Sequence, residues 1–343
     1  MSNAMYFSTA VPQGWTANNI EAKLSVRSRI FPVPKSLLPQ EQNLLNLLKT
    51  PQSWEVRHQH GRGTCNAFAA IAAQELFRMI RGEDTEPSDL SEEHLYAKTR
   101  AVDYDVVPGK IPIAAQHEFD KTGGTFLAQV RVALQEHGMA LEEQVPYRPS
   151  AAVNYVAQHI PEEVDQKARE RRVEHSLIHD ITDATIGEGR LWWRLKDEID
   201  LLLLFAYHLK QGFPVVASFA IPADCQYVWA GELAYATGQV RYPPLGIIGD
   251  RPAVAGHTVC LIGYVPPADP ADETEGWFLF RNSYGTRLFG RYAKDFPENP
   301  NGGLPGYGFI SARDVNLYCW EFLIPSDQES LFFLDAAPTA PDI

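Results

Sequence analysis

Cys65 follows a glycine-containing loop and stands just before an alanine-rich apolar stretch. That stretch, residues 67–81, predicts a helix that ends at Gly82. A cysteine at the N-terminus of a helix faces the positive end of the peptide dipoles, which favours thiolate over thiol. Gln59, six residues earlier, could supply a side-chain amide donor. A thiolate beside a fixed donor is the first half of acyl-transfer chemistry.

The other side chains that this chemistry needs lie far downstream. His257 begins an apolar run, residues 257–264, and Asn282 follows a second one, residues 277–281. Both runs predict β-strands, which places His257 and Asn282 at strand ends. A thiolate needs a general base, and the base needs a group that fixes its ring and tautomer. Cys65, His257 and Asn282 could fill these three roles.

These motifs resemble those of the papain-like cysteine peptidases, the C1 family that includes the cathepsins. Members carry an oxyanion-hole glutamine six residues before the nucleophile, which is the spacing of Gln59 to Cys65. Their histidine opens a strand that ends in Gly-Tyr, as His257 does here. Their Asn-Ser-Trp-Gly-Thr motif begins at Asn282 and differs here at Tyr284 alone. Three lesser matches follow the family order: Leu90-Ser91-Glu92-Glu93, Gly123-Gly124 and Val145-Pro146-Tyr147.

The resemblance implies an α+β, papain-like two-lobe fold. A helical lobe would carry Cys65, an antiparallel β-barrel lobe would carry His257 and Asn282, and the active site would lie in the cleft between them. Gln59 and the Cys65 backbone N–H would hold the oxyanion. The residues implied to bind substrate are Gly123, Gly124, Thr125, Phe126, Gly256 and Tyr284. No cofactor is implied.

The chain departs from the family pattern beside the nucleophile. The local signature is Cys-Gly-Ser/Ala-Cys-Trp/Tyr. Arg62 stands where the first cysteine would be, and Asn66 replaces the aromatic residue. Gly256 precedes the histidine where many relatives have Asp or Asn, and Tyr284 replaces the tryptophan that shields the His–Asn hydrogen bond. These changes bear on efficiency and subsite preference more than on the reaction class.

Each of these residues also has an ordinary structural interpretation. A cysteine before an apolar helix is often a small buried hydrophobe, and a histidine in an apolar strand is often a core residue. Asn282 and the pair Gly123-Gly124 could simply form turns. The ordered set of motifs favours the catalytic interpretation.

Composition sets the outer bounds. The chain has 343 residues and a net charge of −13, which argues against nucleic acid as a partner but permits a basic peptide substrate. Four cysteines include Cys65, so the other three cannot all pair. This favours a reducing environment. No secretory signal opens the sequence, so we expect a cytoplasmic protein or one exported without a cleaved signal peptide.

The sequence shows no sign of a membrane or metal partner. The longest apolar run, residues 201–206, is too short to span a membrane. Cysteine and histidine do not cluster at zinc-binding spacings, and no phosphate-binding glycine loop is present. The expected partner is a peptide or protein substrate, and the oligomeric state is left open.

The chain divides into four predicted segments. Ser2-Asn3-Ala4 resembles the remnant of an expression tag, so we expect the natural chain to start at Met5. Residues 161–176 are highly charged and predict a solvated helical insertion. The segments are an expression remnant plus N-terminal arm at 1–53, the helical lobe at 54–212, the β-barrel lobe at 213–335 and a flexible tail at 336–343.

Smaller elements follow from periodicity and from breakers. Further helices are predicted at 41–48, from 88 onward, at 126–136 and at 197–210. Further strands are predicted at 214–219 and 306–310.

The sequence therefore predicts a thiol hydrolase that cleaves peptide bonds through a Cys65 acyl-enzyme, with His257 as base and Asn282 as orienter. Two alternatives remain open. One is an amidase, transpeptidase or deamidase that acts on one specific protein. The other is a catalytically silent papain-fold binding protein.

Overall fold

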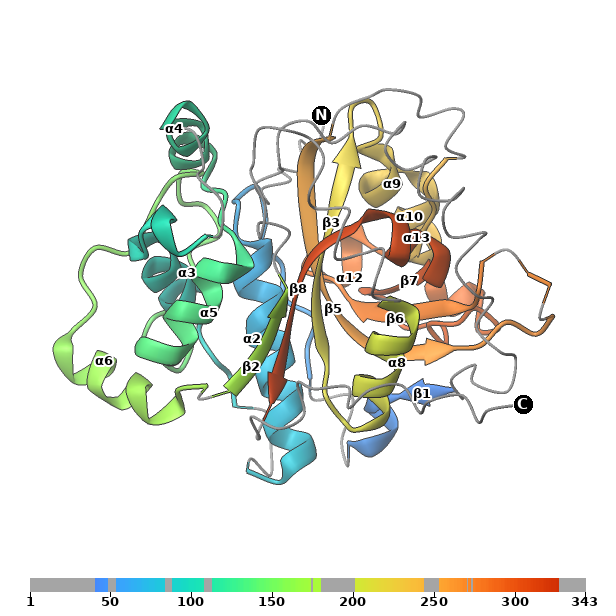
Figure 1. The fold of residues 1–343 in the computed structure, drawn as a ribbon, viewed down its shortest axis with the longest axis horizontal. Helices are drawn as coiled ribbons and strands as arrows, with labels where there is room; N and C mark the ends of the chain where they lie inside the picture. The colour runs from blue at the N-terminus through green and yellow to red at the C-terminus, as the bar shows by residue number, and fades with distance from the viewer. Residues whose placement is uncertain are drawn as a thin grey trace, which may run out of the picture.

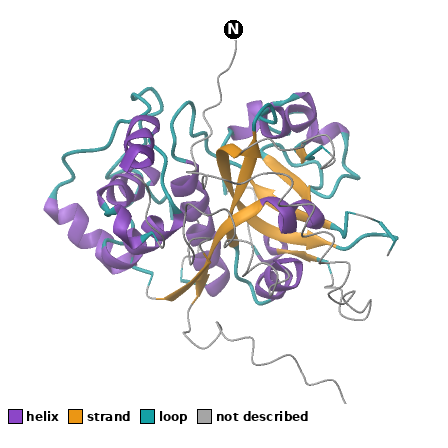
Figure 2. Cartoon of the chain, turned by 45° about the horizontal axis from the view of Figure 1, so that its top comes forward, coloured by secondary structure: helices purple, strands orange, loops and turns teal. Residues whose placement is uncertain are grey.

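The computed structural model describes residues 41–48, 54–83, 88–107, 113–173, 175–179, 201–243, 253–269, 271–272 and 274–326. A group of helices stands beside a large sheet, and helix α2 (Cys65–Arg81) lies between the two (Figure 1, Figure 2). This is the α+β class expected from the sequence. The predicted tail at 336–343 and most of the N-terminal arm lie outside the described residues.

The helices fall into two groups (Figure 1). One group precedes the main strands in the chain: α2, α3 (Glu92–Ala101), α4 (Ile113–Thr122), α5 (Leu127–Glu136) and α6 (Glu162–Ala168). The other lies around the sheet: α8 (Leu201–Lys210), α9 (Tyr227–Ala230), α10 (Glu232–Thr237), α12 (Gly285–Leu288) and α13 (Ala312–Tyr318). Short 3-10 helices occur at Leu44–Leu47, Tyr104–Val106, Arg169–Arg171 and Ala293–Asp295.

Local chemistry explains where the predicted helices begin and end. Helix α2 ends at Gly82, whose φ of 73° is in the left-handed region that glycine adopts without strain. The side chain of Ser91 caps α3 by accepting from the His94 N–H at 2.9 Å. The prediction of a helix at 67–81 is confirmed, with Cys65 as the first residue of α2.

The charged insertion is also helical. It forms α6 and the 3-10 turn Arg169–Arg171, and most of its charged side chains face solvent. Val164 and Ala168 are buried against Ala140 and Val145, so one face of the insertion packs on the helical group. Residues 162–171 agree with the predicted solvated helix, whereas His175 and Ser176, at the end of the predicted range 161–176, belong to strand β2.

The sheet is antiparallel apart from one pair of strands. Its order is β2-β8-β3-β5-β6-β7-β4, and β1 pairs with β5. Strands β4 and β7 are parallel. The strands are β1 (Gln42–Asn43), β2 (His175–His179), β3 (Val215–Pro222), β4 (Gln239–Val240), β5 (Ala253–Val265), β6 (Trp277–Arg281), β7 (Tyr307–Ser311) and β8 (Cys319–Ser326). Strands β3, β5, β6 and β7 confirm four predicted strands, whereas β8 was not predicted.

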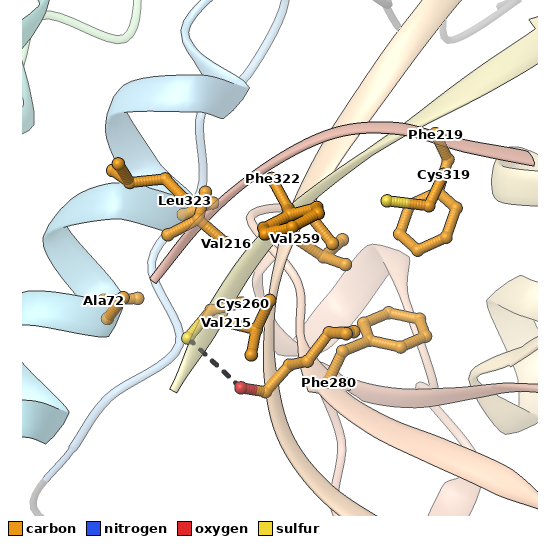
Figure 3. Packing of buried hydrophobic residues seen from close by; sticks show 14 of the residues in the cluster. Ala72, Val215, Val216, Phe219, Val259, Cys260, Phe280, Cys319, Phe322 and Leu323 are labelled. Atoms are coloured by element: carbon orange, nitrogen blue, oxygen red, sulfur yellow. Dashed lines mark hydrogen bonds between the residues drawn. The ribbon is translucent and has the colours of Figure 1, made fainter. Parts of the chain in front are cut away.

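Contacts between the two groups hold the molecule together. Helix α2 packs against β3, β5 and β8, and Figure 3 shows Ala72 beside the strands that carry Val216, Cys260 and Leu323. The alanines of this helix let its backbone approach the sheet closely. The carboxylate of Glu321 on β8 accepts from the Leu127 N–H at 3.0 Å, at the positive end of α5. Strand β2 and helix α8 both precede residue 212. Strand β2 belongs to the sheet and pairs with β8, and helix α8 packs against β3 and β5.

No disulfide forms within the chain. All four cysteines lie among the described residues, and each is buried and outside any disulfide. The stability of the fold should therefore not depend on the redox state of the solution.

We predict that the thermal unfolding midpoint is the same with and without a reductant, because no covalent bond is lost on reduction. Differential scanning calorimetry under both conditions tests this. A midpoint that drops by several degrees on reduction would show that a disulfide stabilises the native protein.

Candidate active site

Cys65 is held at the start of α2 by its own loop. Only 1% of the Cys65 surface is exposed, so the protein encloses the thiol. The preceding residue, Thr64, has its hydroxyl 2.9 Å from the Tyr147 hydroxyl. Tyr147 in turn donates to the Gln59 carbonyl at 2.7 Å. One tyrosine thus ties the residue before the nucleophile to the candidate oxyanion residue.

Arg62 fixes the same loop through an ion pair and hydrogen bonds. Its guanidinium pairs with the Glu93 carboxylate at 2.6 Å and 3.1 Å, and it also donates to the Tyr155 carbonyl at 3.1 Å. The guanidinium lies 4.8 Å from the ring centre of Tyr147. A bidentate buried pair with an aromatic contact is geometrically specific. Arg62 therefore attaches the nucleophile loop to α3.

The candidate base lies inside a strand. His257 is fully buried in β5, opposite Phe219 of β3. The prediction that His257 begins its strand is wrong, because β5 starts at Ala253 and its pairing with β3 continues through Gly256. The ring packs edge-on against Trp229, with centroids 4.9 Å apart.

Asn282 contacts the imidazole directly. Its Oδ1 is 2.8 Å from Nε2 of His257 and also accepts from the Ser283 backbone N–H at 2.8 Å. Burial lowers the pKa of His257 to about 4, and the Asn282 hydrogen bond opposes this only in part. The imidazole is therefore neutral near neutral pH.

Tyr284 covers the same ring. Its ring stacks on the imidazole of His257 at 4.6 Å between centroids, and its hydroxyl is 3.2 Å from Nδ1. Burial raises the pKa of Tyr284 well above its ordinary value, and the nearby Cys65 raises it further. The phenol therefore stays protonated beside both candidate catalytic groups.

Two backbone hydrogen bonds join the segment of Gln59, the candidate oxyanion residue, to the segment that follows Asn282. The Gln59 N–H donates to the Ser283 carbonyl at 2.8 Å, and the Gly285 N–H donates to the Arg57 carbonyl at 3.1 Å. The Gln59 side chain accepts from the Ser283 hydroxyl and donates to the Arg62 carbonyl at 2.8 Å. Gln59 is thus fixed relative to both the nucleophile loop and Asn282.

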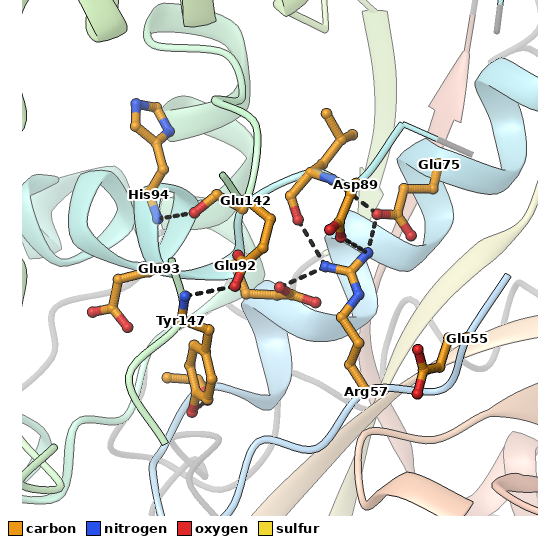
Figure 4. A network of polar contacts seen from close by, with 12 residues as sticks. Glu55, Arg57, Glu75, Asp89, Glu92, Glu93, His94, Glu142 and Tyr147 are labelled. Atoms are coloured by element: carbon orange, nitrogen blue, oxygen red, sulfur yellow. Dashed lines mark hydrogen bonds and ion pairs between the residues drawn. The ribbon is translucent and has the colours of Figure 1, made fainter. Parts of the chain in front are cut away.

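Buried charges anchor these segments to α2 and α3. The Arg57 guanidinium pairs with Glu75 of α2 and with Glu92 of α3, the latter at 2.7 Å (Figure 4). Burial raises the pKa of Glu92 to about 8, although Arg57 opposes the shift. Glu75 also pairs with Arg281 at the end of β6. These contacts connect the helices to the strand that precedes Asn282.

The residues that follow Cys65 and His257 are hydrogen-bonded to each other. The Thr258 hydroxyl donates to Oδ1 of Asn66, and it lies 2.7 Å from the Ser218 hydroxyl. Ser218 in turn donates to Glu321 at 3.2 Å. Since Asn66 follows Cys65 and Thr258 follows His257, this chain of hydrogen bonds holds α2 against β5 at the site.

Sequence reasoning singled out Asn66 only as a departure from the family, and it missed Ser218, Thr258 and Glu321. A signal was available, because each is a polar residue inside an otherwise apolar strand.

The glycine pair serves packing as well as any substrate. Gly123 has a φ of 78°, and an added Cβ would lie 2.6 Å from the Tyr96 hydroxyl and 2.7 Å from the Val153 carbonyl. The Gly124 carbonyl accepts from Arg100 at 2.9 Å. The fold itself therefore requires a glycine at position 123.

The other expected substrate residues differ in their surroundings. Thr125 is buried, and its carbonyl and hydroxyl accept from the Asn66 amide, one residue from Cys65. Phe126 instead packs edge-on against Phe119 and Trp320 in the core. Gly256 is buried in β5 opposite Ala220. Of this set, Thr125 and Tyr284 have side chains in the network around Cys65 and His257.

Neither a metal cluster nor a membrane span was found in the part of the chain that the structure describes. There, no three or more His, Cys, Asp or Glu side chains group in a way that could hold a metal ion. Among the same residues, no helix is both long and apolar enough to cross a membrane.

Solved cysteine proteases share this fold. Xylellain, a cysteine protease from Xylella fastidiosa, matches with a TM-score of 0.55 over 86% of this chain and 90% of its own, at 17% identity. Procathepsin B S9 from Trypanosoma congolense matches with a TM-score of 0.50 over 86% of this chain and 81% of its own, at 14% identity. No protein-family model matches the chain, and no curated protein matches it in sequence. The chain therefore has the papain-like fold, as its motifs predict.

We predict that a small thiol reagent modifies Cys65 faster than the other three cysteines. Cys65 lies at a helix N-terminus, whereas burial raises the pKa of Cys260 to about 12. Timed iodoacetamide labelling near neutral pH, read by peptide mass mapping, measures all four rates in one sample. Equal rates at Cys65, Cys225, Cys260 and Cys319 would contradict a special environment for Cys65.

Proposed function

We propose that the protein is a papain-like thiol hydrolase that cleaves peptide bonds through an acyl-enzyme on Cys65. The hydrogen bond from His257 to Asn282, next to the backbone hydrogen bonds that fix Gln59, is the observation that carries this proposal. It supplies a base, its orienting group and a fixed amide donor for the chemistry proposed at Cys65. The papain-like fold supports the same reaction class.

The mechanism assigns one role to each group. His257 takes the Cys65 proton through Nδ1 as the sulfur attacks the scissile carbonyl. The Gln59 amide and the Cys65 backbone N–H stabilise the oxyanion that forms. His257 then protonates the leaving amine, and water, deprotonated by His257, releases the acyl group. Throughout, Asn282 holds the ring through Nε2, the nitrogen that does not face the reaction.

Gln59 suits the oxyanion role because its side chain cannot rotate freely. Its Oε1 is occupied by Ser283 and one Nε2 hydrogen by the Arg62 carbonyl, which leaves the second Nε2 hydrogen for the substrate. A donor that is already positioned needs no reorganisation as charge develops.

The expected substrate is a peptide or protein. The family resemblance supports a binding mode in which the peptide backbone passes Gly124. Thr125 and Asn66 add hydrogen-bonding groups close in sequence to Gly124 and to the proposed nucleophile Cys65. A screen with a mixed peptide library distinguishes a general peptidase, which cuts many sequences, from an enzyme that modifies one specific protein. A catalytically silent binding protein would cut none.

We predict that Cys65→Ala and His257→Ala each abolish peptide cleavage while the fold is retained. Gln59→Ala should lower kcat by about 10²–10³, as loss of one oxyanion donor does in other hydrolases. Asn282→Ala should have a smaller effect, because Asn282 orients the ring and transfers no proton.

Steady-state kinetics with a library-derived peptide measures these effects, and circular dichroism checks the fold. Cys225→Ala, which removes a buried thiol remote from these roles, is the matched control and should remain active. Full activity in Cys65→Ala would refute the mechanism.

A further inference from the structure

The hydrogen bonds around His257 determine where its ring protons lie. Oδ1 of Asn282 accepts from the Ser283 backbone N–H, which fixes the orientation of the Asn282 amide. The atom that faces Nε2 of His257 is therefore an oxygen, which can only accept. Nε2 must carry a proton, and in the neutral ring Nδ1 then presents a lone pair.

That lone pair is occupied by Tyr284. The Tyr284 hydroxyl is 3.2 Å from Nδ1, and the phenol is protonated because burial and Cys65 both raise its pKa. Tyr284 therefore donates and His257 accepts. Nδ1 is also the atom that must take the thiol proton, so Tyr284 and Cys65 depend on the same lone pair.

We propose that Tyr284 is a positioning residue whose hydroxyl holds His257 as the neutral, Nε2-protonated imidazole and keeps the resting site in the thiol–imidazole state. The proposal rests on the proposed function, in which His257 is the base for Cys65. Proton transfer then requires the phenol to release Nδ1, for which its O–H needs only to rotate about the C–O bond.

A tryptophan at this position, as in relatives, lacks a hydroxyl. The stacked tyrosine ring can shield the histidine as an aromatic residue does, and its hydroxyl adds the bond to Nδ1. The balance between thiol and thiolate at Cys65 is therefore set in part by one oxygen atom.

The groups that act on this cluster come from several elements. Cys65 comes from α2, Tyr284 follows β6, and α9 contributes the neutral Trp229. Tyr96 of α3 also interacts with Cys65, and its pKa is raised by burial and by the charge of Cys65, so its phenol stays protonated. His58, whose backbone pairs with that of Tyr284, has its pKa lowered to about 4 by burial and by His60. Between about pH 5 and pH 9 neither His257 nor Tyr284 titrates on its own, so a change in the alkylation rate reports mainly on the proton that Cys65 and His257 exchange.

The test is the pH profile of Cys65 alkylation by iodoacetamide, which needs no peptide substrate. Tyr284→Phe removes only the hydroxyl. Its rate at about pH 6 should exceed the wild-type rate about tenfold, because the freed Nδ1 can hold the thiol proton. Tyr284→Trp should shift the profile in the same direction. Tyr292→Phe, at an exposed tyrosine, is the matched control and should not shift it.

A second measurement uses the unaltered protein. Nitrogen NMR with isotope-labelled histidine, assigned by the signal lost in His257→Gln, should show a protonated Nε2 and an unprotonated, hydrogen-bonded Nδ1 at about pH 7. A protonated Nδ1, or a Tyr284→Phe alkylation profile that superimposes on the wild type, would overturn the proposal. If the profile shifts but no variant cuts peptides, the proposed function fails and the role of Tyr284 stands.

Discussion

Both ring nitrogens of the buried His257 have hydrogen-bond partners, and these two contacts organise the site around it. Asn282 is hydrogen-bonded to Nε2 and Tyr284 to Nδ1, and both residues belong to the segment that follows β6. That segment must therefore lie across β5 at the level of His257. Its backbone also pairs with the segment at Gln59, so the arrangement that satisfies the histidine also places the candidate oxyanion donor.

Polar contacts, with no disulfide, hold the loop before Cys65 in place. Arg62 joins this loop to Glu93, and Arg57 joins the Gln59 segment to Glu75 and Glu92. Buried ion pairs contribute little net stability, but breaking one leaves an uncompensated charge at a cost of about 3–5 kcal/mol. These ion pairs instead fix the position of the loop, because their geometry holds it in one orientation relative to α2 and α3.

Sequence reasoning predicted the elements whose signals are local. The Cys65 helix, its glycine end and four strands follow from apolar periodicity and breakers. Strand β8 was missed because its short, mostly apolar run, which Glu321 interrupts, does not distinguish a buried strand from a helix. The start of β5 was misplaced because Ala255 and Gly256 are weak strand formers, and only pairing with β3 extends the strand over them.

In the site, too, features with a local sequence signal could be predicted, and features that depend on tertiary contacts could not. The spacing of Gln59 to Cys65 and the Asn282 motif could be read from the sequence. The contact of Tyr284 with Nδ1 depends on a side-chain rotamer, and the packing of Gly123 depends on the Val153 backbone far along the chain. Neither leaves a local pattern, because both arise only when distant segments fold together.

The central claim is that Cys65 becomes acylated, and trapping that intermediate tests it most directly. The protein would be mixed with an activated peptide ester, quenched in acid within the first turnover and analysed by intact mass and peptide mapping. We predict one acyl group per chain, attached to Cys65 and lost in Cys65→Ala. Turnover of the ester with no covalent adduct, or with the adduct on another residue, would contradict the account.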